Sequence, residues 1–597
     1  MKDFFKMFFA STLALAFVCG ALCAGVVLLL IGLSSMAESE PKLQKNSVLV
    51  FDMSSNIQDA PVSTTQEEII AEITGGNRPP KLALRQVLTA IDTAASDKNI
   101  KGIFIKGSFR PDGYGSGFAA LKEVREALVR FKEESAKPVI AHVVYPTARD
   151  LYVASAADTV YMNPEGLLLN SGMASQPMFL AGFFKKYGIG VQITKAGEFK
   201  SAAESLVRET MSGPARIQTE ALLEDLWANY VDAVSSKADM SFDEFQALVD
   251  AKGLLTADDA LEAGIVDELA FADQLLEELQ EITGDSKRKV DLASIGLGHY
   301  IQLKTGEAAG GSHIAVVYAE GEIVTGNGND GQIGGDKLAR EIRQLRYDKS
   351  VKAIVLRVNS PGGSALASEV IQREVKLAQE QMPVVVSMGS VAASGGYWIS
   401  AYSDRIFAQP NTITGSIGVI GLFMNFKEIA NNHGVTFDLV KTAKFADVMS
   451  PVRPKTEEEM ALIQKGVDEV YDDFLDRVSE GRDLDRDHVA EIAEGRVWSG
   501  EDALEIGIVD ELGGLGDAIA HAAELAELGN NPTIRDYPAP VDFFEELLKG
   551  LANGEQVMAR NEALQAVKST LDELRALSQF DDPKGVYAIM PYKIEIK

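Results

Sequence analysis

The chain has 597 residues, of which 46% are hydrophobic and 24% charged, so it can bury a sizeable core and general disorder is excluded. Its 57 basic and 87 acidic side chains give a net charge of −30, which argues against nucleic acid as a partner because the phosphate backbone would be repelled. The chain has two cysteines, Cys19 and Cys23, and its six histidines form no close ligand pair. We therefore expect no disulfide scaffold and no local metal site. No cofactor is expected either.

A run of 27 uncharged residues at positions 7–33 opens the chain. A spanning helix needs about 20 apolar residues and a signal-peptide core only about 7–15, so the run predicts a transmembrane anchor within residues 1–45. Ser35-Met36-Ala37 resembles a cleavage site, which leaves removal of the anchor open. Lys2 and Lys6 precede the span and place the N-terminus in the cytoplasm. These features predict a single-pass protein of the inner (plasma) membrane, with the bilayer as a partner and the remaining domains on the periplasmic side.

The sequence after the anchor is written twice. Residues 259–269 and 502–512 are identical at ten of eleven positions, at an offset of 243, and weaker matches follow upstream in the same order. A period of about 245 residues is far longer than a solenoid repeat and indicates a duplicated domain. We place the first copy at 46–290, a linker at 291–310 and the second copy at 311–540.

Each copy alternates short apolar runs with amphipathic stretches, a pattern that predicts an α/β domain with helices covering a sheet. In the second copy we expect strands at 313–318, 353–356 and 383–386, and helices at 336–347 and 365–380. The tail, 541–597, has Leu564, Val567, Leu571 and Leu574 at helical spacing, so a helix is expected there too.

The most unusual local sequence surrounds Ser394, in Ala-Ala-Ser-Gly-Gly between an apolar strand and a predicted helix. Small neighbours let a substrate backbone approach closely, and a helix start directs free N–H groups at an oxyanion. About 35 residues earlier, Asn359-Ser-Pro-Gly-Gly363 follows a strand, and paired glycines permit a tight turn with exposed N–H groups. Taken alone, each segment is also compatible with an ordinary turn.

Comparison of the two copies favours a functional site over ordinary turns, because each copy lacks the group that the other retains. Ser394 corresponds to Ala148 in the first copy at an offset of 246, and the Pro-Gly-Gly turn is also missing there. In the opposite direction, Lys200 of the first copy corresponds to Ala446 of the second, again at 246. One copy therefore holds a candidate nucleophile and the other a candidate base.

A serine and a lysine make a chemically sensible pair. Serine is inert until a base removes its proton, and lysine can do so only when neutral. Lowering the lysine pKa from its free value of ~10.4 by about 3 costs ~4 kcal/mol, so Lys200 should lie in an apolar, closed site. By its local sequence alone, Lys200 is more typical of a solvated surface amine, and the comparison of the two copies is what favours a base.

With these residues in view, the chain resembles the signal peptide peptidase A family in its long, duplicated bacterial form, also called protease IV. The resemblance rests on Phe199-Lys-Ser-Ala-Ala203, Asn359-Ser-Pro-Gly-Gly363, Ala393-Ser-Gly-Gly-Tyr397 and Thr414-Gly-Ser-Ile-Gly418. It implies tandem crotonase/ClpP-like domains and a membrane-anchored serine peptidase that degrades cleaved signal peptides. It assigns Ser394 as nucleophile and Lys200 as general base.

The same resemblance implies further site residues and an oligomer. Ser416 would orient the lysine amine, and the oxyanion hole would be formed by Gly363 and the N–H of Gly395, with Gly362 as a close alternative to Gly363. The partners would be peptide substrates, and the chain would form a homotetramer. A ring in which complete and incomplete sites alternate would explain the complementary losses, with the live pair either within one chain or between chains.

Two other functions are compatible with parts of the sequence. An acyl-CoA hydratase or isomerase of the same fold also uses backbone N–H pairs, but leaves the anchor and the Ser394/Lys200 complementarity unexplained. An inactive membrane scaffold would predict decay of both candidate groups, whereas each copy retains the one that the other lacks.

Overall fold

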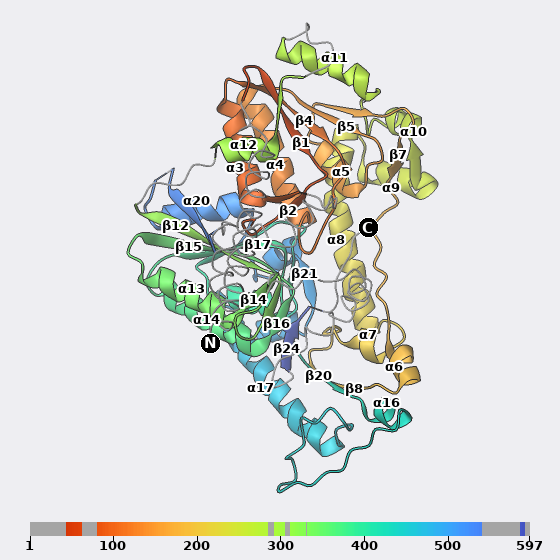
Figure 1. The fold of residues 1–597 in the computed structure, drawn as a ribbon, viewed down its shortest axis with the longest axis vertical. Helices are drawn as coiled ribbons and strands as arrows, with labels where there is room; N and C mark the ends of the chain where they lie inside the picture. The colour runs from red at the N-terminus through yellow and green to blue at the C-terminus, as the bar shows by residue number, and fades with distance from the viewer. Residues whose placement is uncertain are drawn as a thin grey trace, which may run out of the picture.

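The computed structural model describes residues 43–62, 80–284, 292–304, 311–329, 331–529, 531–539 and 586–590. In Figure 1 the sheet of the first copy, coloured red to orange, lies above the second copy, coloured green to blue, while α8 (Gly213–Ala238) and the segments before it run down beside the second copy. The predicted anchor at 7–33 and the predicted tail helix around 564–574 lie outside the described residues. Among the helices that the structure does describe, none is long and apolar enough to cross a membrane.

Each copy is built on a parallel sheet with the same strand order. The first sheet runs β10-β6-β5-β4-β1-β11, and the second contains β22-β18-β17-β15-β12-β23 in the equivalent places. The first set is β1 (Ser47–Asp52), β4 (Ile100–Lys106), β5 (Val139–Val143), β6 (Thr159–Met162), β10 (Glu268–Leu269) and β11 (Ser294–Gly296). The second set is β12 (His313–Glu320), β15 (Val351–Ser360), β17 (Val384–Ala393), β18 (Arg405–Ala408), β22 (Glu511–Leu512) and β23 (Thr533–Tyr537). The duplication seen in the sequence is therefore a duplication of topology.

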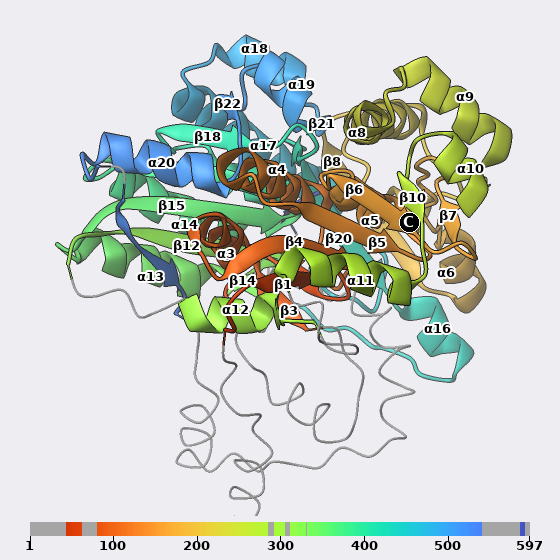
Figure 2. The same cartoon turned by 90° about the horizontal axis from the view of Figure 1, so that it is seen from above.

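The central strands are continuous apolar runs because helices cover both faces of each sheet. The helices that pack on the sheets or join the copies are α3 (Leu84–Ser96), α4 (Phe118–Ser135), α8 (Gly213–Ala238), α13 (Gly335–Tyr347), α14 (Ala365–Gln379), α17 (Glu457–Arg482) and α20 (Leu515–Leu525). Helix α13 buries Leu338, Ile342 and Leu345 on one face, as their spacing predicts. Figure 2 shows α4 of the first copy beside α20 of the second, so the two copies pack closely.

The segment predicted as a linker, 291–310, contains part of the first domain. Strand β11 pairs in parallel with β1, and α12 (Leu297–Lys304) buries Tyr300 and Ile301 against the same core. Strand β23 takes the equivalent place beside β12 in the second copy. A three-residue edge strand is too short to give an apolar run, which is why the sequence pattern reads as a linker.

A third sheet joins the two copies. Its order is β14-β13-β16-β24-β20-β8. Its strands are β8 (Gly190–Ala196), β13 (Glu322–Val324), β14 (Gln332–Gly334), β16 (Gly362–Ser364), β20 (Val419–Asn425) and β24 (Val586–Ile589). Strand β8 of the first copy pairs antiparallel with β20 of the second along seven residues, from Gly190↔Asn425 to Ala196↔Val419. This pairing carries the residues that follow β8 into the second copy.

Candidate active site

Ser394 lies at the junction between β17 and the short helix α15 (Gly395–Ser400) and is fully buried. Its backbone has φ 57° and ψ −114°, a conformation rarely adopted by a residue with a side chain. The Ser394 N–H donates to the Gly415 carbonyl at 2.8 Å. Backbone strain of this kind persists only where the surrounding structure imposes it, and strained residues cluster at functional sites. The sharp turn therefore makes Ser394 a candidate functional residue.

Lys200 reaches Ser394 from the other copy of the same chain. It lies four residues after β8, and its side chain is 1% exposed. Its Nζ lies 2.7 Å from Ser394 Oγ, although the two residues are 194 positions apart. Each of these two residues is replaced by alanine in the other copy, and the structure brings them together within one chain.

The second copy clamps the segment that carries Lys200. The Phe199 N–H donates to the Glu494 carbonyl at 2.8 Å. A side chain at Gly495, where φ is +75°, would meet the Lys200 Cβ at 2.6 Å, so only glycine permits this approach. From α8, Gln218 donates to the Phe199 carbonyl at 2.9 Å and accepts from the Val497 N–H at 3.1 Å.

Ser416 completes the surroundings of the amine. Lys200 Nζ lies 2.7 Å from the Ser416 carbonyl oxygen and 3.0 Å from its Oγ. The Ser416 hydroxyl points its own proton toward the Gly495 carbonyl, 3.4 Å away, which leaves a lone pair for the lysine. A neutral amine has two N–H bonds and one lone pair. With both N–H bonds directed at Ser416, the lone pair faces the Ser394 hydroxyl.

Burial lowers the pKa of the Lys200 amine well below its usual range. Desolvation is the cause, since an ammonium loses its hydration in this closed site and no carboxylate among the described residues compensates. The amine is therefore suited to accept a proton from a serine hydroxyl.

The glycine turn lies beside the start of α15. Gly362 and Gly363 have φ values of +98° and +153°, so the Pro-Gly-Gly turn requires glycine at both positions. The Gly362 N–H donates to Ser360 Oγ at 3.1 Å, which makes it the weaker candidate for an oxyanion donor. Gly395 begins α15, where N–H groups have no partner within the helix.

The positions that correspond to Ser394 and Lys200 in the opposite copies, Ala148 and Ala446, do not form a second pair in this chain. Ala148 begins α5 (Ala148–Ala154) in the first copy, whereas Ala446 is exposed in a loop of the second.

Two features of the site had no signal in the sequence. Gln218 reads as one more polar residue of a long helix. Strand β24, which pairs with β16, comes from the tail 541–597, for which the spacing predicted only a helix.

Comparison with known proteins identifies the family. The model of peptidase family S49 matches residues 131–284 and 376–529, once in each copy. Protease 4 of Haemophilus influenzae is 32% identical and aligned over 94% of both chains. Protease 4 of Salmonella typhi is 34% identical over 90% of this chain and 89% of its own.

Two further matches cover a single copy's length. A putative signal peptide peptidase SppA of Enterococcus faecium is 35% identical over 41% of this chain and 71% of its own. The solved structure of a ClpP1 mutant from Listeria monocytogenes covers 34% of this chain and 94% of its own, at 17% identity and a TM-score of 0.24. The duplicated α/β fold and the protease relatives define a serine protease. The chain belongs to peptidase family S49.

Replacing Ser416 by alanine tests the hydroxyl that faces the amine. We expect kcat to fall about tenfold, because the amine loses one of the two acceptors that orient its lone pair. KM should change little, and the Ser416 carbonyl still holds Nζ at 2.7 Å, so the fold should survive. Steady-state kinetics with thermal unfolding as the control measures both, and an unchanged kcat in the folded variant would contradict an orienting role.

Proposed function

We propose that this chain is a membrane-anchored serine peptidase that degrades cleaved signal peptides, with Ser394 as nucleophile and Lys200 as general base. The observation that carries the proposal is the 2.7 Å approach of the buried Lys200 Nζ to Ser394 Oγ. A buried neutral amine beside a hydroxyl on a strained turn has no evident structural purpose, because burying it costs folding free energy.

The reaction follows from this arrangement. Lys200 takes the proton from Ser394 as its Oγ attacks the peptide carbonyl, while Ser416 holds the amine in place. The N–H groups of Gly395 and Gly363 stabilise the negative charge that develops on the carbonyl oxygen. Lys200 then gives its proton to the departing amine, and a water molecule, activated by the same lysine, releases the acyl group from Ser394.

Strand β24 supports an extended peptide as the substrate. It lies between β16 and β20 and pairs antiparallel with both, with Gly362 opposite Ile589 and Ile420 opposite Tyr587. The following residue, Met590, donates its N–H to the Pro361 carbonyl at 2.7 Å. The position beside the glycine turn therefore accepts an extended chain by strand addition, which is a general way of binding peptides, and a substrate bound there would take the place of β24.

Apolar side chains pack next to Ser394. One buried cluster includes Ala393, the residue before the proposed nucleophile, together with Ile413, Val497, Leu222 and Leu226, and Met590, which follows β24, packs against it. Signal-peptide cores are apolar, so small or aliphatic side chains before the cut are the expected preference.

A pair of peptides tests the substrate proposal. One is a synthetic signal peptide with a leucine-rich core, and its control has the same length with alternate core leucines replaced by lysine. We expect the full chain in detergent to cleave the first at least about tenfold faster, since a charged side chain is costly to bury. Faster cleavage of the lysine peptide, or cutting mainly after Arg or Lys, would overturn the proposed substrate class.

The location rests on the apolar run at 7–33. We propose that it anchors the chain in the inner membrane as a single span, with both copies on the periplasmic side and the bilayer as a partner. Protease added to spheroplasts should digest the catalytic domains while the cytoplasm stays intact. A chain that begins at residue 40 should leave the membrane fraction, and its retention there would contradict the anchor.

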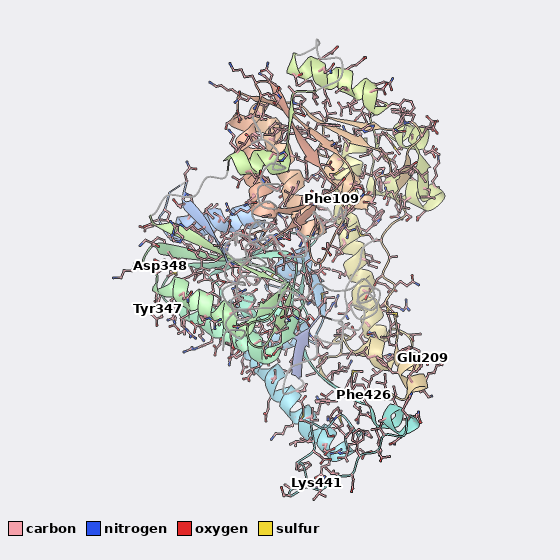
Figure 3. The ribbon with its side chains drawn as sticks, viewed as in Figure 1. Phe109, Glu209, Tyr347, Asp348, Phe426 and Lys441 are labelled. Atoms are coloured by element: carbon pink, nitrogen blue, oxygen red, sulfur yellow. The ribbon has the colours of Figure 1, made fainter. Side chains whose placement is uncertain are left out.

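The duplication also supports a ring of chains. At an offset of 246, β8 corresponds to residues 436–442 of the second copy, which form an exposed arm. Phe437 and Val440 on this arm are 53% and 96% exposed, and Lys441 lies at the far tip in Figure 3. The first-copy counterpart of β20 is 173–179, where Met178 is 68% exposed. We propose that the arm of one chain pairs with 173–179 of the next, as β8 pairs with β20 within a chain.

Closure of this arrangement gives the homotetramer that the family resemblance implies, with the alanine-containing interfaces between chains. Replacing Phe437 and Val440 by aspartate should convert the tetramer into smaller species, because two apolar side chains would be exchanged for charges at the joint. Light scattering after size exclusion measures the mass. A wild-type chain that is monomeric at micromolar concentration would refute the ring.

A further inference from the structure

A cluster of buried charged side chains joins the two copies at a distance from the proposed dyad. Arg357 on β15 is fully buried, and its guanidinium contacts Asp59 Oδ1 and Glu123 Oε1, both at 2.7 Å. Asp59 and Glu123 belong to the first copy and are also buried. The same guanidinium donates to Ser387 Oγ at 2.7 Å. Arg357 therefore links β15 to two acidic residues of the other domain.

Asp59 differs from Glu123 in what its second oxygen does. Asp59 Oδ2 accepts from Asn359 Nδ2 at 2.6 Å, whereas Glu123 Oε2 accepts from the Leu515 N–H at 2.7 Å. Asn359 in turn accepts from the Val391 N–H at 3.2 Å through its Oδ1. A chain of two hydrogen bonds thus runs from the first copy through Asn359 to β17, three residues before Ser394.

Val391 belongs to an irregularity in the sheet. Along β15 and β17, Val358 lies opposite Met388 but Ser360 lies opposite Ala392, so Asn359 alone faces residues 389–391. The ladder is broken there, and the Asn359 side chain provides the acceptor that the Val391 N–H would otherwise lack. A Cβ at Gly389 would lie 2.9 Å from Asp59 Oδ2 and 3.0 Å from the Asn359 Cβ, so both side chains press on this bulge.

The bulge changes the neighbour of β17. Before it, residues 385–387 pair with β18, and after it, residues 391–393 pair with β19 (Ile413–Gly415). Ala393 lies opposite Gly415, whose carbonyl also accepts the Ser394 N–H. Bulges beside active sites redirect the side chains that follow them. The conformation of residues 389–391 therefore sets where Ser394 stands.

We infer that Asp59 is a positioning residue for the reaction, acting through Asn359 to hold the bulge that aims Ser394 at Lys200 and at the glycine turn. The first copy then supplies two parts of the site, the lysine and the support beneath the serine. The inference rests on the proposed role of Ser394. It concerns a residue that touches neither the substrate nor the reacting atoms.

Three single variants separate positioning from stability. Asp59→Asn keeps the shape, but its single amide oxygen can accept from Arg357 or from Asn359 and not from both. With the oxygen held by the charged guanidinium, its NH₂ is set against the Asn359 NH₂, which breaks the link. Glu123→Gln makes the same chemical change at the same guanidinium but leaves the hydrogen bonds from Asp59 through Asn359 to Val391 in place, so it is the matched control. Asn359→Ala leaves the Asp59–Arg357 ion pair in place and removes the link, together with a long contact from Asn359 Nδ2 to the Tyr114 carbonyl at 3.4 Å, so it tests the inference even if Asp59→Asn does not fold.

For Asp59→Asn and Asn359→Ala we expect kcat to fall about 10- to 100-fold with KM nearly unchanged, as for a displacement of about 1 Å at the reacting atoms. The rate at which a fluorophosphonate labels Ser394 should fall in parallel. Glu123→Gln should keep kcat within about twofold of the wild-type value when it is assayed well below its unfolding temperature. This should hold even if Glu123→Gln lowers Tm as much as Asp59→Asn does. In the double variant Asp59→Asn/Asn359→Asp, the amide NH₂ at position 59 can donate to the carboxylate at position 359. This variant should therefore recover most of the labelling rate.

Two results would overturn the inference. One is a folded Asn359→Ala chain with kcat within about twofold of the wild type. The other is a loss of kcat in Glu123→Gln equal to that in Asp59→Asn, which would make the effect one of general stability. Failure of the proposed function looks different, because the wild-type chain itself would then resist labelling at Ser394.

Discussion

We expect Ser394→Ala and Lys200→Met each to reduce peptide hydrolysis by at least about 10³-fold, the size of effect seen when a member of a catalytic unit is removed. The alanine variant lacks the proposed nucleophile, and the methionine variant keeps the volume of Lys200 but lacks the proposed proton acceptor. Removing both should cost little more than removing one if the pair acts as a unit. Turnover of a fluorogenic peptide measures the loss, and circular dichroism confirms that each variant is folded.

Mixing the two inactive variants provides a sharp control. The structure places Lys200 Nζ and Ser394 Oγ 2.7 Å apart within one chain, so exchange of subunits brings no intact pair together. We expect no recovery of activity. Recovery toward a quarter or more of the wild-type rate would show that the working pair spans two chains, and full activity in either folded single variant would eliminate the dyad.

The second large effect is on pH dependence. Because burial lowers the pKa of Lys200, kcat/KM should rise about tenfold per pH unit below that pKa and level off well before the usual lysine value of 10.5. Below its folded-state pKa the amine is an ammonium and cannot accept the serine proton. A pH–rate profile with no rise below about pH 9 would contradict a buried lysine base.

Stability should follow pH in a matching direction. Between the folded-state pKa of Lys200 and 10.5, the unfolded chain binds a proton that the folded chain does not. The free energy of unfolding therefore rises with pH in this window, by up to about 1.4 kcal/mol per pH unit from this residue. Lys200→Met lacks this cost, so its stability advantage over the wild type should be greatest at low pH and shrink as pH rises. Denaturant titrations of both proteins at several pH values isolate the difference.

The repeat made the central part of the site predictable. Alignment of the two copies paired Ser394 with Ala148 and Lys200 with Ala446 without any structural information. The differences between the two copies indicated a contact between Lys200 and Ser394, which are 194 positions apart. Hydrophobic periodicity indicates only local structure and could not have predicted this contact. The central strands and the α13 helix were predicted from apolar runs and spacing, because burial on both faces of a sheet leaves a strong pattern.

Other features depend on tertiary packing and left no pattern. Asp59 follows a three-residue strand, β2 (Asn56–Gln58), and reads as a surface turn, yet it is buried against Arg357 of the other copy. Its partner Asn359 belongs to a recognised motif, but the bulge that it supports appears only when β15 and β17 are paired. Strand β11 is hidden for a similar reason, since an edge strand of three residues is defined by its neighbour β1 rather than by its own sequence.

The division of the dyad between the two halves has a consequence for biogenesis. The lysine belongs to the half that is synthesised first, and the serine to the half that follows 194 residues later. A nascent chain that has emerged only as far as the first domain has no serine beside Lys200. On the proposed roles of the two residues, the pair forms only when β8 has paired with β20 and the second domain has folded around the lysine, so we expect the chain to be synthesised as an inactive precursor.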